Sequence, residues 1–426
     1  MCISIFLLLI FACFSPTFAG ETLEDAWNIA IHESRQLKSQ RAGTAAAEAD
    51  LDTAFATKMP KVKNTTLYTA ITPTPEISLE FPGTAASIET PIIGNHLLVS
   101  STLVTVPLYM GGKTQSLMDQ AQARVRASES GEITSLQDLK MNVADNYFLV
   151  LRLQGMIEVM EDSEKALASH EKNVEKMLKT GVATRNAYLS AQVAHADAQQ
   201  KTMQARNTLL IAESAYNRYL WRPLDTPVEL EQRNIPPSAG NLEGYILTAI
   251  SQRSELRRLS AESRAMQAQA KEYRSDRLPH LTATGGYTHL QTERLAENNF
   301  WSGSVGMTWT PFDGGASRSR QRSAEMRAVA IMNTREDMKS AIELEVRRNW
   351  LEEQDSRRRV VVAQKAIEQA EENLRVVDKR FRQGLSTHTE VLDAVTLYTQ
   401  ARTNYCNAAY DAILATYRLR RATGGL

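Results

Sequence analysis

The chain has 426 residues, and its 49 Lys and Arg balance its 49 Asp and Glu, so its formal net charge is zero. This balance gives no indication of a polyanionic partner such as nucleic acid. Beyond residue 20 no apolar run reaches the roughly eighteen residues of a membrane-spanning helix, so any membrane part must be a β-barrel. Cys406 is the only cysteine in that part, which excludes an intramolecular disulfide.

Residues 1–20 indicate a secretory signal peptide. Ile3–Phe14 is apolar but too short to span a bilayer, and the small residues Thr17 and Ala19 follow as a cleavage site. No Lys or Arg precedes the apolar run, which departs from the usual pattern. A lipoprotein signal ending at Cys13 is an alternative. Either signal predicts an exported protein.

The sequence is internally duplicated. Gly181 and Gly384 lie 203 residues apart, and the same spacing relates Gly111 to Gly314. Upstream the spacing is 219, and the difference arises within 71–95, which is rich in Pro, Thr and Gly and predicts a long loop. We therefore expect two structural repeats joined by a proline-containing linker, with the bounds 21–220, 221–240 and 241–426.

Each repeat contains one very long predicted helix, at 113–180 and 316–383, which is roughly 100 Å at 1.5 Å per residue. Apolar residues recur every seven positions, as in a coiled-coil seam. The seam positions include Val360, Ile367, Leu374 and Phe381 in the second long helix and Leu189, Ala196, Met203 and Leu210 in the first returning helix. Glycine turns at 181–184 and 384–387 would close two antiparallel hairpins, whose returning helices are predicted at 185–220 and 388–422.

A helix and then two strands precede each long helix. The strands are predicted at 61–71 and 97–106 in the first repeat and at 280–290 and 300–310 in the second. Apolar residues alternate with small polar residues, as at Val305 and Ser304, which is typical of a membrane barrel and also of a half-buried soluble hairpin. Four strands cannot close a barrel, whereas three chains would supply twelve. The predicted strand-to-helix bends contain Pro107, Gly111, Gly112, Pro311, Gly314 and Gly315.

With the duplication, the two tips and these junctions, the sequence resembles the TolC-type outer-membrane efflux proteins, also called outer membrane factors. The resemblance runs from residue 23 to the C-terminal helix. It is carried by RQGLSTHTEVLDA (382–394), VPLYMGGK (106–113), TPFDGG (310–315) and PLDTPVEL (223–230). It implies an α+β membrane protein, a homotrimer with a twelve-stranded transmembrane β-barrel in the outer membrane and a barrel of antiparallel coiled-coil helices across the periplasm.

The resemblance implies a passive exit channel of a tripartite efflux or type I secretion system. Its partners would be a periplasmic adaptor, an inner-membrane transporter and outer-membrane lipid. An enzyme has no support in the sequence, no cofactor is expected, and the seven histidines lack metal-site spacing. The alternative is an exported periplasmic coiled-coil protein with a structural or adaptor role. The sequence does not identify the transported substrate.

The resemblance also implies site residues. Glu390 and Asp393 match the positions at which family members narrow the tunnel, although Thr387 and Glu390 also form a capping-box pattern that would use this carboxylate locally. Phe381 and Ser386 replace the tyrosine and arginine of the family's closed-state latch. The tips match the segment that meets the adaptor, which comprises Gly181, Val182, Ala183, Thr184, Gly384, Leu385, Ser386 and Thr387.

Overall fold

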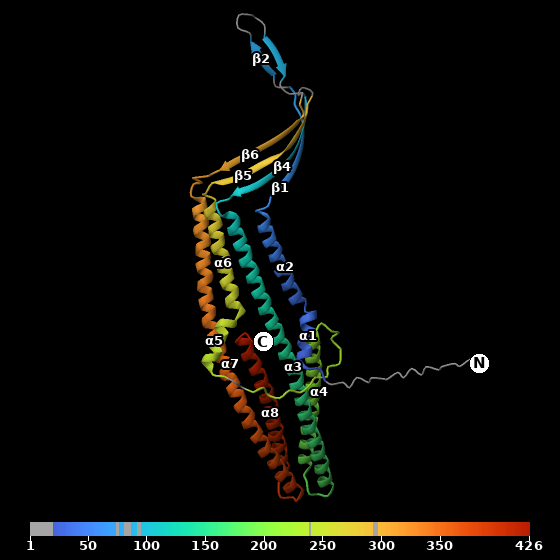
Figure 1. Cartoon of the computed structure of the whole chain (residues 1–426). Coiled ribbons are helices and arrows are strands. Elements are labelled where there is room, and N and C mark those ends of the chain that lie inside the picture. Colours follow the sequence, from blue (N-terminus) through green and yellow to red (C-terminus); the bar gives the residue numbers. More distant parts are fainter. Residues whose placement is uncertain (1–19, 74–75, 81–86, 92–94, 238–239, 293–296) are drawn as a thin grey trace, which may run out of the picture. The chain divides into compact units, whose positions relative to one another are not determined.

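The computed structural model describes residues 20–73, 76–80, 87–91, 95–237, 240–292 and 297–426 (Figure 1). The predicted signal peptide, including Cys13, lies outside the described residues except for Gly20. The described chain is mostly helical, with a four-stranded antiparallel sheet and a separate two-stranded one. In this part of the chain no helix combines the length and the hydropathy that crossing a membrane requires.

The same series of elements occurs twice along the chain. The first series is α1 (Leu23–Glu33), α2 (Arg35–Ala56), β1 (Lys61–Ala70), β4 (His96–Tyr109), α3 (Lys113–Lys179) and α4 (Arg185–Tyr219). The second is α5 (Leu242–Gln252), α6 (Ser254–Ser275), β5 (His280–Gln291), β6 (Asn299–Thr308), α7 (Ala316–Arg382) and α8 (His388–Ala422). Corresponding helices have the same lengths of 11, 22, 67 and 35 residues, which supports the proposed duplication.

The prediction of one helix before the strands was wrong, because each repeat has two. The helical backbone is interrupted at Ser34 and at Arg253, whose ψ angles of 114° and 121° are extended. Ser34 Oγ then accepts a hydrogen bond from the amide of Leu37 at 3.2 Å and so caps the start of α2. Each break depends on the backbone dihedrals of a single residue. The helical pattern of side chains continues across it, so the sequence does not reveal the break.

The loop predicted over 71–95 was also partly wrong. Short strands β2 (Glu76–Glu80) and β3 (Ser87–Pro91) pair there as an antiparallel hairpin (Figure 1). The surrounding Pro, Thr and Gly residues obscured this hairpin, since each strand is only five residues long.

The described chain divides into two compact units, and each unit takes segments from both repeats. One comprises residues up to 38, 135–253 and 341–426, and the other comprises 39–134 and 254–340. The repeats are therefore intertwined and are not separate domains.

The sheet lies in the second of these units, with the strand order β1-β4-β5-β6 and all neighbours antiparallel (Figure 1). Its central pair, β4 and β5, joins the hairpin of one repeat to that of the other. The two strands approach most closely at Gly286, where a Cβ atom would lie 2.2 Å from the carbonyl oxygen of Thr102. Glycine is therefore required at this position.

The main hydrophobic core lies in the other unit, where α1, α3, α4 and α8 meet. Tyr147, Phe148 and Tyr216 are its largest buried side chains, each 0% exposed. The Tyr147 hydroxyl lies 2.8 Å from the carbonyl oxygen of Glu21 and 2.7 Å from that of Glu231. The start of the described chain and the linker are thus held to the same long helix.

The predicted seams differ in outcome between the two hairpins. On α7, Val360, Ile367 and Leu374 are half-buried and Phe381 is buried, as expected of a seam. On α4 the predicted seam is not buried within the single chain. Leu189, Met203 and Leu210 are 48%, 58% and 61% exposed, and the buried face instead comprises Ala187, Ala191, Ala198 and Thr202. The larger apolar side chains of α4 therefore have no cover within the described part of one chain.

Candidate functional sites at the hairpin tips and on the sheet

Both hairpin tips are closed by the same hydrogen-bonded turn. At the first, the amide of Val182 donates to the carbonyl oxygen of Met177 and that of Gly181 to Leu178, at 2.8 and 3.0 Å. At the second, Leu385 donates to Arg380 and Gly384 to Phe381, both at 2.9 Å. These are the two bonds of a Schellman motif, and the glycines adopt the left-handed φ values of 76° and 73° that it requires.

A threonine caps the helix that leaves each tip. Thr184 Oγ1 accepts from the amide of Ala187 at 3.2 Å, and Thr387 Oγ1 accepts from that of Glu390 at 3.3 Å. Val182 and Leu385 extend from the turns and are 68% and 65% exposed. Each tip therefore presents one uncovered apolar side chain on a well-ordered turn.

The two predicted pore acids lie in different surroundings. Glu390 completes the capping box with Thr387, and the Ser386 hydroxyl donates to its second carboxylate oxygen at 2.6 Å. These bonds lower the pKa of Glu390, and the bond from Ser386 has the largest effect. Asp393 is exposed and makes no hydrogen bond or ion pair with any described residue. The local role considered for Glu390 is therefore present, whereas Asp393 is unengaged in the single chain.

Phe381 and Ser386, which were expected at the positions of the family's latch, both have clear contacts. Ser386 holds Glu390, as described above. Phe381 is 6% exposed and packs on the ring of His170 of α3, with the ring centroids 5.0 Å apart. It belongs to an apolar group, here called the tip cluster, that joins both hairpins. The tip cluster comprises Leu167, Val174, Ala187, Ala191, Ala198, Phe381, Val391 and Val395.

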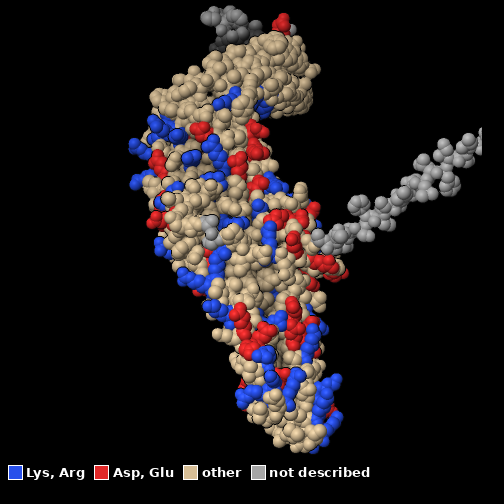
Figure 2. All heavy atoms as spheres, turned by 60° about the horizontal axis from the view of Figure 1, so that its bottom comes forward, with Lys and Arg blue, Asp and Glu red and all other residues tan. Residues whose placement is uncertain are grey.

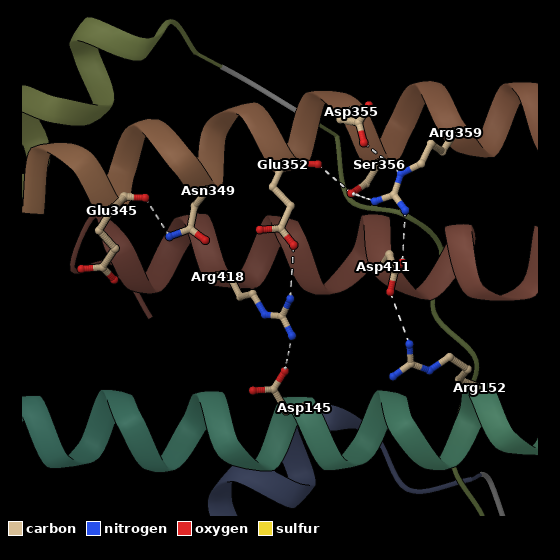
Figure 3. A network of polar contacts seen from close by, with 10 residues as sticks. All are labelled: Asp145, Arg152, Glu345, Asn349, Glu352, Asp355, Ser356, Arg359, Asp411 and Arg418. Carbon is tan, nitrogen blue, oxygen red and sulfur yellow. Dashed lines mark hydrogen bonds and ion pairs between the residues drawn. The ribbon is translucent and has the colours of Figure 1, made fainter.

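Farther along the hairpins, ion pairs connect α3, α7 and α8 (Figure 3). Arg418 on α8 lies 3.2 Å from Asp145 on α3 and 3.5 Å from Glu352 on α7. Asp411 on α8 similarly lies between Arg152 of α3 and Arg359 of α7, at 3.3 and 3.5 Å. Partly exposed pairs contribute about 0–1 kcal/mol each, so this network orients the helices more than it stabilises them. Sequence reasoning missed it because the partners come from distant segments.

The four-stranded sheet has an apolar stretch on one face, at the strand ends that adjoin the helices. Farther along the strands both faces are mixed, with Asn64 and Thr102 on this face and Leu67 and Leu103 on the other. On the apolar face the register aligns Val62, Val104, Gly285 and Gly303 in one row and Val106, Ala283 and Val305 in another. On the opposite face Thr105, Thr284 and Ser304 form a row. Trp301, Val305 and Met307 of the apolar face are 83%, 69% and 65% exposed. An exposed apolar surface of this kind requires lipid or another protein to cover it.

The sheet is also almost without charge. Lys61 and Lys63 at the start of β1 are the only charged residues in β1, β4, β5 and β6. On the face seen in Figure 2 the helices carry acidic and basic side chains of both signs, whereas the sheet region is almost entirely uncharged. The apolar face can therefore enter an apolar medium without burying a charge.

The strand-to-helix bends are built from the paired glycines. Gly111, Gly112, Gly314 and Gly315 have φ values of 60°, 84°, 67° and 85°. Pro311 lies between β6 and α7. Pro107 lies within β4, opposite Thr282 and beside a register shift, so it precedes the bend. Among the described residues no group of three or more His, Cys, Asp or Glu has metal-site geometry.

Comparison with known proteins identifies the family. The profile described as "Outer membrane efflux protein" matches residues 27–220 and 246–425. The chain belongs to the outer membrane efflux protein family. It is 25% identical over 344 residues to outer membrane protein TolC of Vibrio cholerae serotype O1 (strain ATCC 39315 / El Tor Inaba N16961), and the alignment covers 78% of each protein.

Solved structures show the same fold. The outer membrane protein VceC from Vibrio cholerae is similar with a TM-score of 0.80 and 16% identity, over 95% of this chain and 96% of that one. The outer-membrane channel OprN is similar with a TM-score of 0.80 and 18% identity, over 95% of this chain and 90% of that one. The predictions of the family, the fold of the single chain, an efflux-channel function and an outer-membrane location are confirmed.

Proposed function

We propose that three copies of this outer membrane efflux protein form a passive exit channel. The channel would receive its substrate from a periplasmic adaptor and an inner-membrane transporter, in a tripartite efflux or type I secretion system. The observation that carries the proposal is the open, almost uncharged sheet with an exposed apolar stretch on one face.

The edges of the sheet support a closed assembly. Within the described part of the chain nothing pairs with the outer edge of β1 or of β6. Unpaired edge strands are normally covered or blunted in a finished protein. Because each chain has four alternating strands, pairing β6 of one copy with β1 of the next keeps the whole sheet antiparallel. Three copies would close a cylinder of twelve strands, wide enough for a water-filled interior.

The helices also require partner copies. The exposed apolar side chains of α4 form a stripe that includes Leu189, Val193, Met203, Leu210 and Ile211. Hydrophobic residues at heptad spacing are normally buried against another helix. We infer that a neighbouring copy covers this stripe, as in a coiled coil between chains.

The tips are the proposed site of adaptor contact and of the pore constriction. Val182 and Leu385 offer small apolar contacts on rigid turns, as a partner of complementary shape would require. Asp393 copied threefold around an axis would favour cations. Glu390 would contribute less, because its carboxylate is already hydrogen-bonded to Ser386 and Thr387.

Substitutions at neighbouring residues on opposite faces of β6 would distinguish the proposed channel from the alternative, a periplasmic coiled-coil protein. Lysine at the lipid-facing middle of a membrane strand costs about 2–4 kcal/mol, whereas a lumen-facing lysine is tolerated. We expect Val305→Lys to abolish recovery of a trimer from outer membranes and Ser304→Lys to preserve both the trimer and its conductance in planar bilayers. A monomer released without detergent, or equal tolerance of both substitutions, would contradict the proposed channel.

A further inference from the structure

A buried histidine lies where the two hairpins meet, beside the tips. His170 is on α3 between Leu167 and Val174 of the tip cluster, and it is 4% exposed. Its Nε2 atom is buried and has no hydrogen-bond partner. A buried polar atom without a partner destabilises the packed state, so its presence here calls for an explanation.

A second histidine faces this region from the other hairpin. His388 is the first residue of α8, and its Nδ1 atom is likewise buried without a partner. The two imidazoles are near enough that a charge on His388 disfavours a charge on His170. They come from opposite hairpins, and the ring of Phe381 on α7 packs on His170.

We propose that His170 and His388 form a pH-sensitive contact, and that acidification releases the α7–α8 hairpin from the α3–α4 hairpin at the tips. A neutral His170 imidazole fits the apolar contact, whereas a protonated His170 would be a buried charge without a hydrogen-bond partner for Nε2 among the described residues. The proposal concerns packing within one chain, so it stands or fails independently of the proposed channel.

Other charged groups around His170 do not neutralise this effect. On α7, Asp378 favours a charge on His170, but Arg382 lies 2.7 Å from that carboxylate and occupies it. On α4, alanines and the half-buried Tyr188 contribute to the tip cluster. His195 of α4 is already paired with Glu171 of α3, with 2.7 Å between Nδ1 and the carboxylate oxygen. On α8, the Glu390 carboxylate is engaged by the Ser386 and Thr387 hydroxyls, and Asp393 is exposed to solvent.

The direction of the pH effect follows from linkage. Burial, and then the neighbouring His388, lower the pKa of His170 to about 4 in the packed state. A released, solvated histidine has a pKa of about 6.5. The packed state therefore has its full stability above about pH 6.5 and becomes less stable, relative to the released state, as the pH falls from there toward 4. Between pH 7.5 and 5.5 the equilibrium should shift roughly tenfold toward release in each chain.

Hydrogen exchange on the full-length protein in detergent tests this inference. After correction for the intrinsic pH dependence of exchange, protection of the amides in the first two turns of α8 should fall about tenfold between pH 7.5 and 5.5. His170→Phe and His170→Gln cannot take up a proton, so whichever of them folds should show no such fall. His388→Ala should retain most of the response, since His170 still titrates and burial is the larger cause of its lowered pKa.

His195→Gln is the matched control, because it removes a tip-proximal histidine that already has a partner. It should keep the full response of the unaltered protein. An unchanged response in the folded His170 variants, or its loss in His195→Gln, would overturn the inference.

Discussion

The two hairpin tips share a backbone but not a packing arrangement. Both end in the same glycine turn and the same threonine cap, yet Ala187 is 8% exposed whereas Glu390, its counterpart 203 residues later, is exposed. After the first tip α4 buries alanines, whereas after the second α8 also buries Val391 and Val395. Duplication thus preserved the local turn, and the partner helices determined which face became buried. An acid could then occupy the exposed position of the second tip alone.

Truncating the apolar contact on each long helix should give the largest difference between the tips. Phe381→Ala removes a buried aromatic side chain and should cost about 3–5 kcal/mol of local stability. Its counterpart Leu178 is half-buried, so Leu178→Ala should cost roughly 1–2 kcal/mol. Hydrogen exchange at the tips measures both opening free energies. Equal losses would show that the tip cluster does not depend specially on the second hairpin.

Replacing the tip glycines should instead affect both hairpins alike. Gly181→Ala and Gly384→Ala each place a Cβ atom in open space but on left-handed backbone, at a cost of about 1–2 kcal/mol. Thermal unfolding in detergent, together with exchange at the two turns, measures this cost. Gly43→Ala is the control with the opposite sign, because Gly43 lies inside α2 and alanine there should stabilise the helix by about 1 kcal/mol.

Removing the threonine caps should destabilise the second tip more than the first, because Glu390 takes part in the second cap. Thr184→Ala and Thr387→Ala each remove an N-cap hydrogen bond that contributes about 1 kcal/mol. Thr387→Ala should be the more damaging at pH 7, since it also removes the hydrogen bond from the Thr387 hydroxyl to the Glu390 carboxylate.

The pH dependence of this difference has a definite sign. The hydroxyl of Ser386, followed by Thr387, lowers the pKa of Glu390, so the ionised carboxylate stabilises the tip above its ordinary titration range. That contribution disappears as the pH falls through the lowered pKa. Exchange measured on both variants down this range should show the gap closing in acid. A gap that widens there would contradict the capping role of Glu390.

Neutralising the acids of the second tip should have the smallest effect in energy. Asp393→Asn should reduce the cation selectivity of the reconstituted channel a few-fold, equivalent to about 1 kcal/mol or less, and Glu390→Gln should reduce it less. Asp197→Asn on α4 provides a matched control, because Asp197 is an exposed acid paired with Lys201. Reversal potentials under a salt gradient measure the selectivity. Equal effects of Asp197→Asn and Asp393→Asn would argue against a ring at the second tip.

Features that depend on a few neighbouring residues were accessible from the sequence. Gly181 and Gly384 indicated the turns because few other residues adopt a positive φ at low cost. The alternation around Val305 indicated a strand with two unlike faces, since side chains of a strand point alternately to its two sides. The heptad on α7 indicated a buried stripe, and the repeated spacing indicated two equivalent sets of elements.

Features that depend on distant segments were decided only by the tertiary structure. The position of His170 against Phe381, the ion pairs of Arg418, and the alanine face of α4 each require helices from different parts of the chain to meet. A heptad predicts that a helix has an apolar stripe but does not predict which helix covers it. On α4 the stripe is exposed in the single chain, and we propose that another copy covers it. Local backbone preferences therefore determined the elements of this protein, and packing between them determined which side chains became buried, paired or free to act.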